Sequence, residues 1–189
     1  HKEYRRQRQM CIRDRQRSRY HAAMTVLAPF PVHWRALRFA ALDTSQLYAV
    51  LRLRTDVFVV EQHCAYPELD GKDTHAEVLH LLGTTDDGAL AAYLRVLPPG
   101  LSYPEPSIGR VVIAAAHRGH GLAHVLLREG LRLVQAQWPG RAVQLGAQTH
   151  LQHLYAAHGF APTSAPYLED GIPHIDMLRR ADAATQELA

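Results

Sequence analysis

Hydrophobic positions recur with a helical period in three segments of the chain. In the first, which follows Asp43, they fall on one helical face: Leu47, Val50, Leu51 and Phe58. Arg54 lies on the same stripe, so an arginine interrupts an otherwise apolar face. Asp43 and Gln46 have the spacing of a capping box, which predicts that the helix begins there.

The second helical segment spans residues 119–137 and is stopped by Pro139 and Gly140. Leucines and valines occupy most of its circumference, which predicts a largely buried helix. The third segment spans residues 149–158. It is followed by Gly159, which suits the left-handed position at a helix C-terminus.

Runs of apolar and β-branched residues predict strands before and between these helices. They cover residues 33–42, 76–84, 89–97, 107–114, 142–147 and 172–180. A turn at Asp86, Asp87 and Gly88 joins two of these strands into a hairpin. The order of strands and helices predicts an α/β (α+β) fold.

Length and composition narrow the class of protein. The 189 residues are 47% hydrophobic, which suits one sizeable core and a single domain. No apolar run approaches the ~20 residues of a membrane span, so we expect a cytoplasmic protein with no membrane partner. Cys11 and Cys64 are the only cysteines in the sequence, too few for a disulfide framework.

Charge separates a basic tail from a mildly acidic body. Residues 1–20 hold eight of the 21 Lys and Arg and two of the 18 acids, a net charge of +6, whereas the remaining residues carry −3. Such a tail is compatible with an arm for nucleic acid. However, "RRQRQMCIRD" resembles one reading frame of a transposon adapter used for sequencing libraries. We therefore expect residues 1–23 to be a non-native or disordered tail, with natural translation from Met24 and no nucleic-acid partner.

The turn between the strand 107–114 and the second helix has features of a phosphate site. A helix N-terminus presents unpaired N–H groups and a partial positive charge, and Gly119 and Gly121 let an anion approach the backbone closely. The pattern is neither a Rossmann fingerprint nor a P-loop, because the third glycine and the Gly-Lys-Ser/Thr triplet are missing. On this loop alone, an ordinary glycine-containing turn explains the sequence equally well.

The order of the motifs resolves that choice. Residues 118–123 ("RGHGLA") match the Arg/Gln-x-x-Gly-x-Gly/Ala signature of the GNAT (GCN5-related) N-acetyltransferases, and "VFVVEQHCAY", "LGAQTHLQHLYAAHGF" and "EDGIPHI" resemble the ElaA branch. The resemblance covers residues 33–180. It implies a GNAT domain at 24–180, followed by a tail at 181–189. Its mixed, mostly antiparallel sheet would be splayed between the strands 107–114 and 142–147 and flanked by helices.

The resemblance also implies a donor and the residues that hold it. Acetyl-CoA would lie in the split, its pyrophosphate on the backbone of Arg118, Gly119, His120, Gly121, Leu122 and Ala123. Its pantetheine would pair with Val111, Val112 and Ile113 as an added strand does. Gln148, which stands where the family often has Asn, would contact the same arm.

The reaction implied is transfer of the acetyl group to a primary amine of a small molecule or peptide. Tyr155 occupies the position of the family's general acid, which protonates the departing thiolate; by itself it also fits an ordinary half-buried helix tyrosine. The amine must lose a proton, and four residues are candidates for the base: Glu61, Asp70, His80 and Glu169. His80 has the most suitable ordinary pKa among them.

Acceptor-binding residues are expected around the polar connector 61–73. The candidates are Arg54, Phe58, Asp70 and Glu169, and the acidic Glu68, Asp70 and Asp73 suit a cationic acceptor. A resemblance to acyl-homoserine-lactone synthases, which share this fold but use acyl-carrier protein, is carried by Arg54, Phe58, Asp70, Asp73 and Arg95. Such a synthase remains an alternative, as does a non-catalytic acyl-CoA sensor. His117, His120 and His124 lack a further ligand, so no metal is expected. A homodimer is left open.

Overall fold

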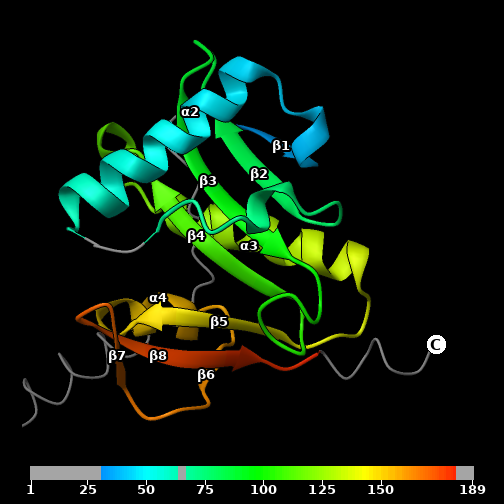
Figure 1. Cartoon of the computed structure of the whole chain (residues 1–189), viewed down its shortest axis with the longest axis vertical. Coiled ribbons are helices and arrows are strands. Elements are labelled where there is room, and N and C mark those ends of the chain that lie inside the picture. Colours follow the sequence, from blue (N-terminus) through cyan, green and yellow to red (C-terminus); the bar gives the residue numbers. More distant parts are fainter. Residues whose placement is uncertain (1–30, 64–66, 182–189) are drawn as a thin grey trace, which may run out of the picture.

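The computed structural model describes residues 31–63 and 67–181 (Figure 1). The predicted tail 1–23, Met24, Cys64 and residues 182–189 lie outside these ranges. Within the described ranges, no helix is both long and apolar enough to cross a membrane.

The described strands form one mixed sheet in the order β1-β2-β3-β4-β5-β8-β6, with β7 also paired to β8. Their bounds are β1 His33–Leu37, β2 Leu79–Thr84, β3 Leu90–Leu97, β4 Ser107–Ile113, β5 Val143–Gln148, β6 Ala161–Pro162, β7 Tyr167–Glu169 and β8 Ile172–Arg179. All pairs are antiparallel except β4 with β5, which confirms the predicted mixed, mostly antiparallel sheet.

The parallel pair of β4 and β5 is where the sheet opens. These strands share one register pair, Ser107 with Gln144, whereas β5 and β8 are paired from Val143 to Gln148. From that point both strands run the same way and separate toward their carboxyl ends, as Figure 1 shows. The expected splay is confirmed, and it divides the sheet into a β1–β4 part and a β5–β8 part.

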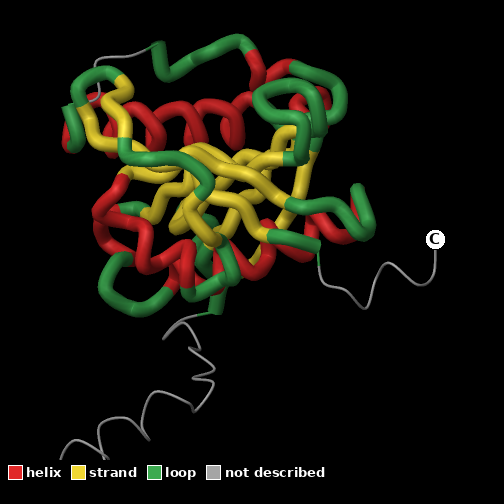
Figure 2. Tube along the Cα trace, turned by 90° about the horizontal axis from the view of Figure 1, so that it is seen from below, coloured by secondary structure: helices red, strands yellow, loops and turns green. Residues whose placement is uncertain are grey.

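Helices cover both faces of the strands (Figure 2). On one face lie α2 (Thr44–Arg54) and the π-helix η3 (Thr55–Glu61), whose Val50, Val57 and Phe58 pack with Tyr93 and Val112. On the other lie α3 (Leu122–Gln137) and α4 (Gln152–Ala156), which share a second core cluster. The two clusters hold the strands between them.

Two local features explain how these helices are placed. The capping box of α2 is confirmed, since Gln46 N donates to Asp43 Oδ1 at 2.8 Å and Asp43 N donates to Gln46 Oε1 at 3.1 Å. Gly130 lets α3 approach β3 closely, because a Cβ at that position would lie 2.7 Å from Leu94 Cδ2. Hence α3 is fixed against the centre of the sheet.

Several predicted boundaries were wrong by a few residues. The strand expected over 33–42 ends at Leu37 and is followed by the 3-10 turn η2 (Phe39–Ala41), and the strand expected from residue 76 begins at Leu79. The helix expected from 119 begins at Leu122, since Gly119 and Gly121 have positive φ. The helix expected over 149–158 divides into the 3-10 turn η6 (Thr149–Leu151) and α4. The short strands β6 and β7 and the 3-10 turns η4 (Lys72–Thr74) and η5 (Ala115–His117) were not predicted.

Candidate active site

A pocket of about 350 Å³ lies where β4 parts from β5. It is lined from four segments of the chain: Val57 of η3; Val111, Val112 and Ile113 of β4; His117, Arg118, Gly119, Gly121, Leu122, Ala123 and His124 of the loop and α3; and Leu151, Leu154 and Tyr155 at α4. Most of the residues expected to hold the donor thus line one cavity, although His120 and Gln148 are not among them.

The loop before α3 has the geometry that an anion needs. Gly119 and Gly121 adopt φ of 81° and 72°, a region that disfavours any residue with a Cβ. No atom lies within 4 Å of the place where a Cβ would stand on Gly119, so the backbone is open there. Among the described residues, no side chain caps α3. His124 N already donates to the carbonyl of Gly121 at 3.0 Å, so the amides that can meet a ligand are those before His124. These features fit a diphosphate.

A β-bulge in β4 shapes the opposite wall of the pocket. The register pairs Tyr93 with Val112 and then Arg95 with Gly109, so Arg110 and Val111 together oppose Leu94. Arg110 has φ of 54°, which is uncommon for a residue other than glycine. The bulge interrupts the ladder at Val111, the first of the three β4 residues that line the pocket. The residue with positive φ is an arginine and not a glycine, so the sequence did not predict the bulge.

Tyr155 is positioned by the end of α4. Its side chain is 6% exposed and lines the pocket, and its ring lies edge-on to Phe160 with centroids 6.1 Å apart. Gly159 reverses the chain with φ of 84°, which brings Phe160 back against the tyrosine. Burial raises the pKa of the Tyr155 hydroxyl to about 12, so the group is protonated at neutral pH.

Glu61 and Arg118 form an ion pair at the edge of the same pocket. Arg118 Nη1 and Nη2 donate to the two carboxylate oxygens of Glu61 at 2.7 and 3.0 Å, and Arg118 Nε donates to the carbonyl of Ile113 at 3.0 Å. The hydrogen bond from Arg118 lowers the pKa of Glu61. The arginine therefore connects η3, β4 and the glycine loop.

Six charged residues form a largely buried network on the α2 face, in which Asp70 and Arg110 are partly exposed: Arg54, Arg95, Arg110, Glu68, Asp70 and Asp73. The fully buried Arg54 donates to Glu68 Oε1 at 2.5 Å and to Asp73 Oδ1 at 2.8 Å. Arg95 donates to Asp73 Oδ1 at 2.8 Å and to both oxygens of Asp70 at 2.8 and 2.6 Å. The three positive and three negative charges balance.

Arg110, in the β4 bulge, is the third arginine of the network. Its Nε lies 2.8 Å from Glu68 Oε2, an ion pair without hydrogen-bond alignment. Burial by itself would raise the pKa of Asp70, but hydrogen bonding and charge from Arg95 outweigh it and hold that pKa well below its ordinary value. Two of the predicted acceptor-binding residues, Arg54 and Asp70, are thus engaged inside the protein.

His80 and Phe58 lie in the core rather than at the pocket. His80 is 1% exposed, with Nδ1 2.8 Å from the Tyr93 hydroxyl and Nε2 3.0 Å from the Asp73 carbonyl. Burial lowers the pKa of the His80 imidazole. Since both ring nitrogens have internal partners, this geometry does not favour His80 as the base. Phe58 packs in the α2-face cluster.

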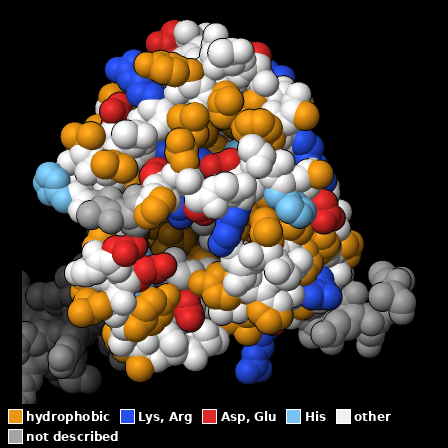
Figure 3. All heavy atoms as spheres, viewed as in Figure 1, with side chains coloured by type: hydrophobic (Ala, Val, Ile, Leu, Met, Phe, Trp, Pro, Cys, Tyr) orange, Lys and Arg blue, Asp and Glu red, His pale blue; other side chains and the backbone are white. Residues whose placement is uncertain are grey.

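The remaining predicted residues lie near the ends of β5 and β7. Gln148 donates from Nε2 to Gln62 Oε1 at 3.1 Å, which links β5 to the end of η3. Glu169 is exposed on β7, with Oε2 3.9 Å from His174 Nδ1. The face seen in Figure 3 is hollowed between the two parts of the sheet. Hydrophobic side chains lie inside the hollow and acidic ones along its lower rim.

The three histidines considered for a metal do not gather. Among residues 31–63 and 67–181, no group of three or more His, Cys, Asp or Glu side chains could hold a metal ion. His124 instead lies against His158, with Nδ1 and Nε2 3.0 Å apart.

Comparisons with known proteins agree with this arrangement. A family model described as an acetyltransferase (GNAT) domain matches residues 54–180. ElaA of Escherichia coli strain K12 is 43% identical over 148 residues, which cover 78% of this chain and 96% of that protein. The crystal structure of Escherichia coli ElaA has a TM-score of 0.74 at 42% identity and covers 79% of this chain and 100% of that chain.

A second solved structure is similar over the same length. The crystal structure of an acyl-CoA N-acyltransferase from Pseudomonas aeruginosa is 45% identical, with a TM-score of 0.75, and covers 79% of this chain and 99% of that chain. The matched region includes the glycine loop, the splayed strands and Tyr155. The chain therefore belongs to the GNAT acetyltransferase family, in its ElaA-like branch.

Proposed function

We propose that this protein transfers the acetyl group of acetyl-CoA to a primary amine of a small molecule or peptide, by direct attack in a ternary complex. The observation that carries the proposal is one cavity in which an uncapped helix N-terminus, the β4 bulge and Tyr155 come together. Proteins with this family's fold and an acyl-CoA donor provide further support. We propose that the protein acts in the cytoplasm.

The donor would be held by backbone groups more than by side chains. The amides from Arg118 to Ala123 would bind the pyrophosphate, and Val111, Val112 and Ile113 would bind the pantetheine arm. Acetyl-CoA supplies the acetyl group as a thioester, which an amine can attack. A β4 amide freed from the ladder by the bulge would donate to the thioester carbonyl, a contact typically worth about 3 kcal/mol in the transition state.

Tyr155 would provide the proton that the leaving group needs. As the amine nitrogen bonds to the acetyl carbon, the carbon–sulfur bond breaks and the phenol protonates the departing thiolate. The high pKa of Tyr155 keeps the proton on the hydroxyl until that negative charge develops. Its position in the pocket wall, between the two parts of the sheet, suits this role.

The base must remove a proton from the acceptor. An amine with pKa ~10.4 is neutral at pH 7 only at a cost of about 4 to 5 kcal/mol. Glu61 and Glu169 are the candidates with solvent access, whereas Asp70 and His80 are held by internal partners. We propose that one of these two glutamates acts through water. The buried Arg54 and Phe58 and the partly buried Asp70 would then position the acceptor side of the site without contacting the acceptor.

The test is to incubate the protein with acetyl-CoA and a panel of polyamines, amino acids, aminoglycosides and peptides while thiol release is followed. We expect amine-dependent release, with acetyl-CoA binding measured in parallel by calorimetry. Binding without release on any amine would favour the non-catalytic sensor, and absence of binding would overturn the proposal. An acyl-carrier-protein donor, as in the acyl-homoserine-lactone alternative, would react where acetyl-CoA does not.

A further inference from the structure

The β5–β8 part of the sheet has one buried face and one polar face. Leu145, Ala147 and Ile175 point to the buried face, where they belong to the core cluster shared with α3 and α4. Side chains alternate along a strand, so the intervening residues point to the opposite side of the sheet. These are Gln144, Gly146 and Gln148 of β5, and His174, Asp176 and Leu178 of β8.

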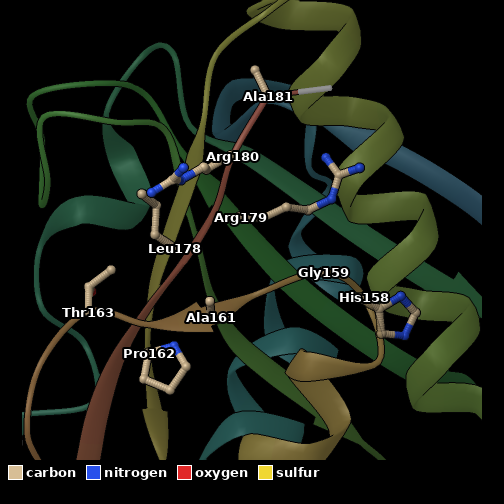
Figure 4. Close-up of a pocket in the computed structure, with 9 residues that line it drawn as sticks. All are labelled: His158, Gly159, Ala161, Pro162, Thr163, Leu178, Arg179, Arg180 and Ala181. Atoms are coloured by element: carbon tan, nitrogen blue, oxygen red, sulfur yellow. The ribbon is translucent and has the colours of Figure 1, made fainter. Parts of the chain in front are cut away.

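Figure 4 shows this alternation at the end of β8. Arg179 reaches toward α3, whereas Leu178 and Arg180 point to the other side of the strand. Arg180 is on the same side as Asp176 but lies about 13 Å further along an extended strand. Within the described ranges, no side chain forms an ion pair with Asp176, and its hydrogen-bond partners are uncharged. The polar face therefore presents a carboxylate without a cation beside it.

Two tyrosines hold this carboxylate in place. Tyr103, from the loop between β3 and β4, and Tyr167 of β7 donate their hydroxyls to Asp176 Oδ1 at 3.2 and 3.0 Å. The amide of Asp176 donates to Ser164 Oγ at 2.9 Å, which fixes the backbone as well. Burial, followed by the hydrogen bond to Asp176, raises the pKa of Tyr167 to about 12, so this hydroxyl stays a donor at neutral pH. The partly exposed carboxylate is thus ordered, and its Oδ2 is left for a ligand.

Gly146 keeps the space beside the carboxylate open. It is paired with Asp176 in the sheet and is exposed. A Cβ at this position would lie 3.1 Å from the Tyr103 hydroxyl, 3.4 Å from the Tyr167 hydroxyl and 3.6 Å from Asp176 Oδ1. Three polar atoms therefore converge on a point that any other side chain would fill. We call these four residues the Asp176 cluster.

The Asp176 cluster lies where the sheet begins to split. β4 and β5 meet at Ser107 and Gln144, and Gly146 is two residues past that pair on β5. The bulge at Arg110 begins three residues past it on β4. None of the four cluster residues lines the donor pocket. An acceptor can therefore occupy the cluster while the donor fills the pocket.

The charge around the cluster favours a cation. The acidic residues between 143 and 181 are Glu169, Asp170 and Asp176, and the first two are exposed. In Figure 3, acidic side chains lie along the lower rim of the hollow between the two parts of the sheet. Such a rim raises the local concentration of cations.

The chemistry of the reaction decides which nitrogen of the acceptor the carboxylate can hold. Pairing with the reacting nitrogen would stabilise its ammonium form and oppose the loss of the proton that attack requires. A second ammonium group on the same molecule would bind without that cost.

We propose that Asp176, positioned by Tyr103 and Tyr167, binds a second ammonium group of the acceptor, so that the preferred acceptors are aliphatic diamines or polyamines. The inference rests on the proposed function and names the acceptor class of that site. Asp176 is a specificity-determining residue and takes no part in forming or breaking the covalent bonds.

The test compares α,ω-diamines with the amino alcohols of the same length, in which a hydroxyl replaces one ammonium group, by thiol release from saturating acetyl-CoA. For the unaltered protein we expect kcat/KM of the best diamine to be about tenfold or more above that of its amino alcohol, the size of a charge-assisted contact. Asp176→Asn keeps an oxygen for the tyrosine hydroxyls but removes the charge, and it should abolish most of this preference.

Asp170→Asn is the matched control. It removes the same charge from the same part of the sheet, at an exposed position with φ of 50° that asparagine tolerates. It should keep the full preference for diamines, and the dissociation constant of coenzyme A should be the same in both variants. Thermal unfolding verifies that each variant is folded, and the comparison of acceptors in the unaltered protein needs no variant.

The outcomes separate this inference from the function on which it rests. Equal kcat/KM for diamines and amino alcohols in the unaltered protein would overturn the subsite and leave the proposed acetyl transfer standing. The same loss of preference in Asp170→Asn as in Asp176→Asn would also overturn it, since the effect would then be one of net charge. If no amine releases thiol, the proposed function fails. Calorimetry of diamines with coenzyme A bound then decides the subsite: binding that Asp176→Asn removes supports it, and absence of binding overturns it.

Discussion

Tyr155 is the side chain on which the proposed chemistry depends most directly. Tyr155→Phe removes the proton donor but keeps the ring against Phe160. We expect kcat to fall by about 10² to 10⁴, the usual contribution of a general acid, while the dissociation constant for coenzyme A stays nearly constant. Steady-state kinetics and calorimetry measure the two effects separately. Tyr48→Phe, at an exposed position of α2, is the control and should change neither.

The pKa of Tyr155 adds a second readout to the same experiment. Because the hydroxyl has a pKa of about 12, it stays protonated far above neutral pH. A pH profile of kcat should therefore show no loss from ionisation of Tyr155 between about pH 7 and pH 10. A decline near pH 10 that disappears in Tyr155→Phe would contradict the buried environment described for this tyrosine.

His80 should matter for stability rather than for catalysis. His80→Phe leaves the Tyr93 hydroxyl and the Asp73 carbonyl without their present partner, which costs about 1 to 3 kcal/mol of unfolding free energy. Denaturant titration measures this loss, and kcat of the folded variant should remain close to that of the unaltered protein. A large drop in kcat with the fold intact would restore His80 as the general base.

The burial of His80 also makes the stability of the protein depend on pH. Folding lowers the pKa of His80, so below the ordinary value of 6.5 the unfolded chain binds a proton that the folded chain resists. The His80 contribution to stability is therefore present above that pH and is lost as the pH falls through it. Unfolding free energies at pH 7.5 and pH 5.5 should differ less in His80→Phe than in the unaltered protein.

At the scale of elements, the buried charge network joins α2, η4, β3 and β4. Asp73 Oδ1 accepts from both Arg54 and Arg95, and Asp73→Asn would leave two buried guanidinium groups with less negative charge beside them. We expect a loss of about 3 to 5 kcal/mol in unfolding free energy, measured by denaturant titration at pH 7. Asp56→Asn is the matched control: its ion pair with Arg52 is exposed, and the change should stay within about 0.5 kcal/mol.

Acid should weaken the same network. Arginine neighbours lower the pKa of Asp70 and of Asp73 despite their burial, so both carboxylates favour the folded state above their ordinary value of 3.8. This contribution is lost as the pH falls through the lower values of the folded protein. Between pH 5 and pH 2 the unaltered protein should therefore lose more stability than Asp73→Asn. Equal losses in the two proteins would mean that the network does not titrate as a unit.

Sequence patterns predicted the elements whose signals are local. The capping box, the helical stripe of α2 and the glycine loop each lie within a few neighbouring residues, and all three were found. The charge network was not predicted, because Arg95 and Asp70 are 25 positions apart in the sequence. The acidic residues were instead interpreted as contacts of the acceptor. The bulge at Arg110 was missed for a related reason: its positive φ falls on an arginine and not on a glycine, and the partner of that arginine, Glu68, is distant in the sequence.

At the scale of the whole molecule, the splayed sheet accounts for the position of the pocket. β4 and β5 meet at Ser107 and Gln144 and then separate, so backbone at the carboxyl end of β4 loses a neighbour that a continuous sheet would provide. The resulting space is lined by Val111 of β4 on one side and by Tyr155 of α4, the helix that follows β5, on the other. A ligand in this pocket would therefore hold the two parts together.

That arrangement predicts where coenzyme A changes hydrogen exchange. Amides of Val111 to Ile113, the first turn of α3, and α4 should all exchange more slowly in saturating coenzyme A, because all three segments line the pocket. At 100 times the dissociation constant, binding should add about 2.7 kcal/mol to the unfolding free energy. Amides between β1 and β2, paired from His33 to Leu37 and away from the pocket, are the internal control. Protection restricted to the first turn of α3, with β4 and α4 unchanged, would mean that the diphosphate binds without the pantetheine entering the split.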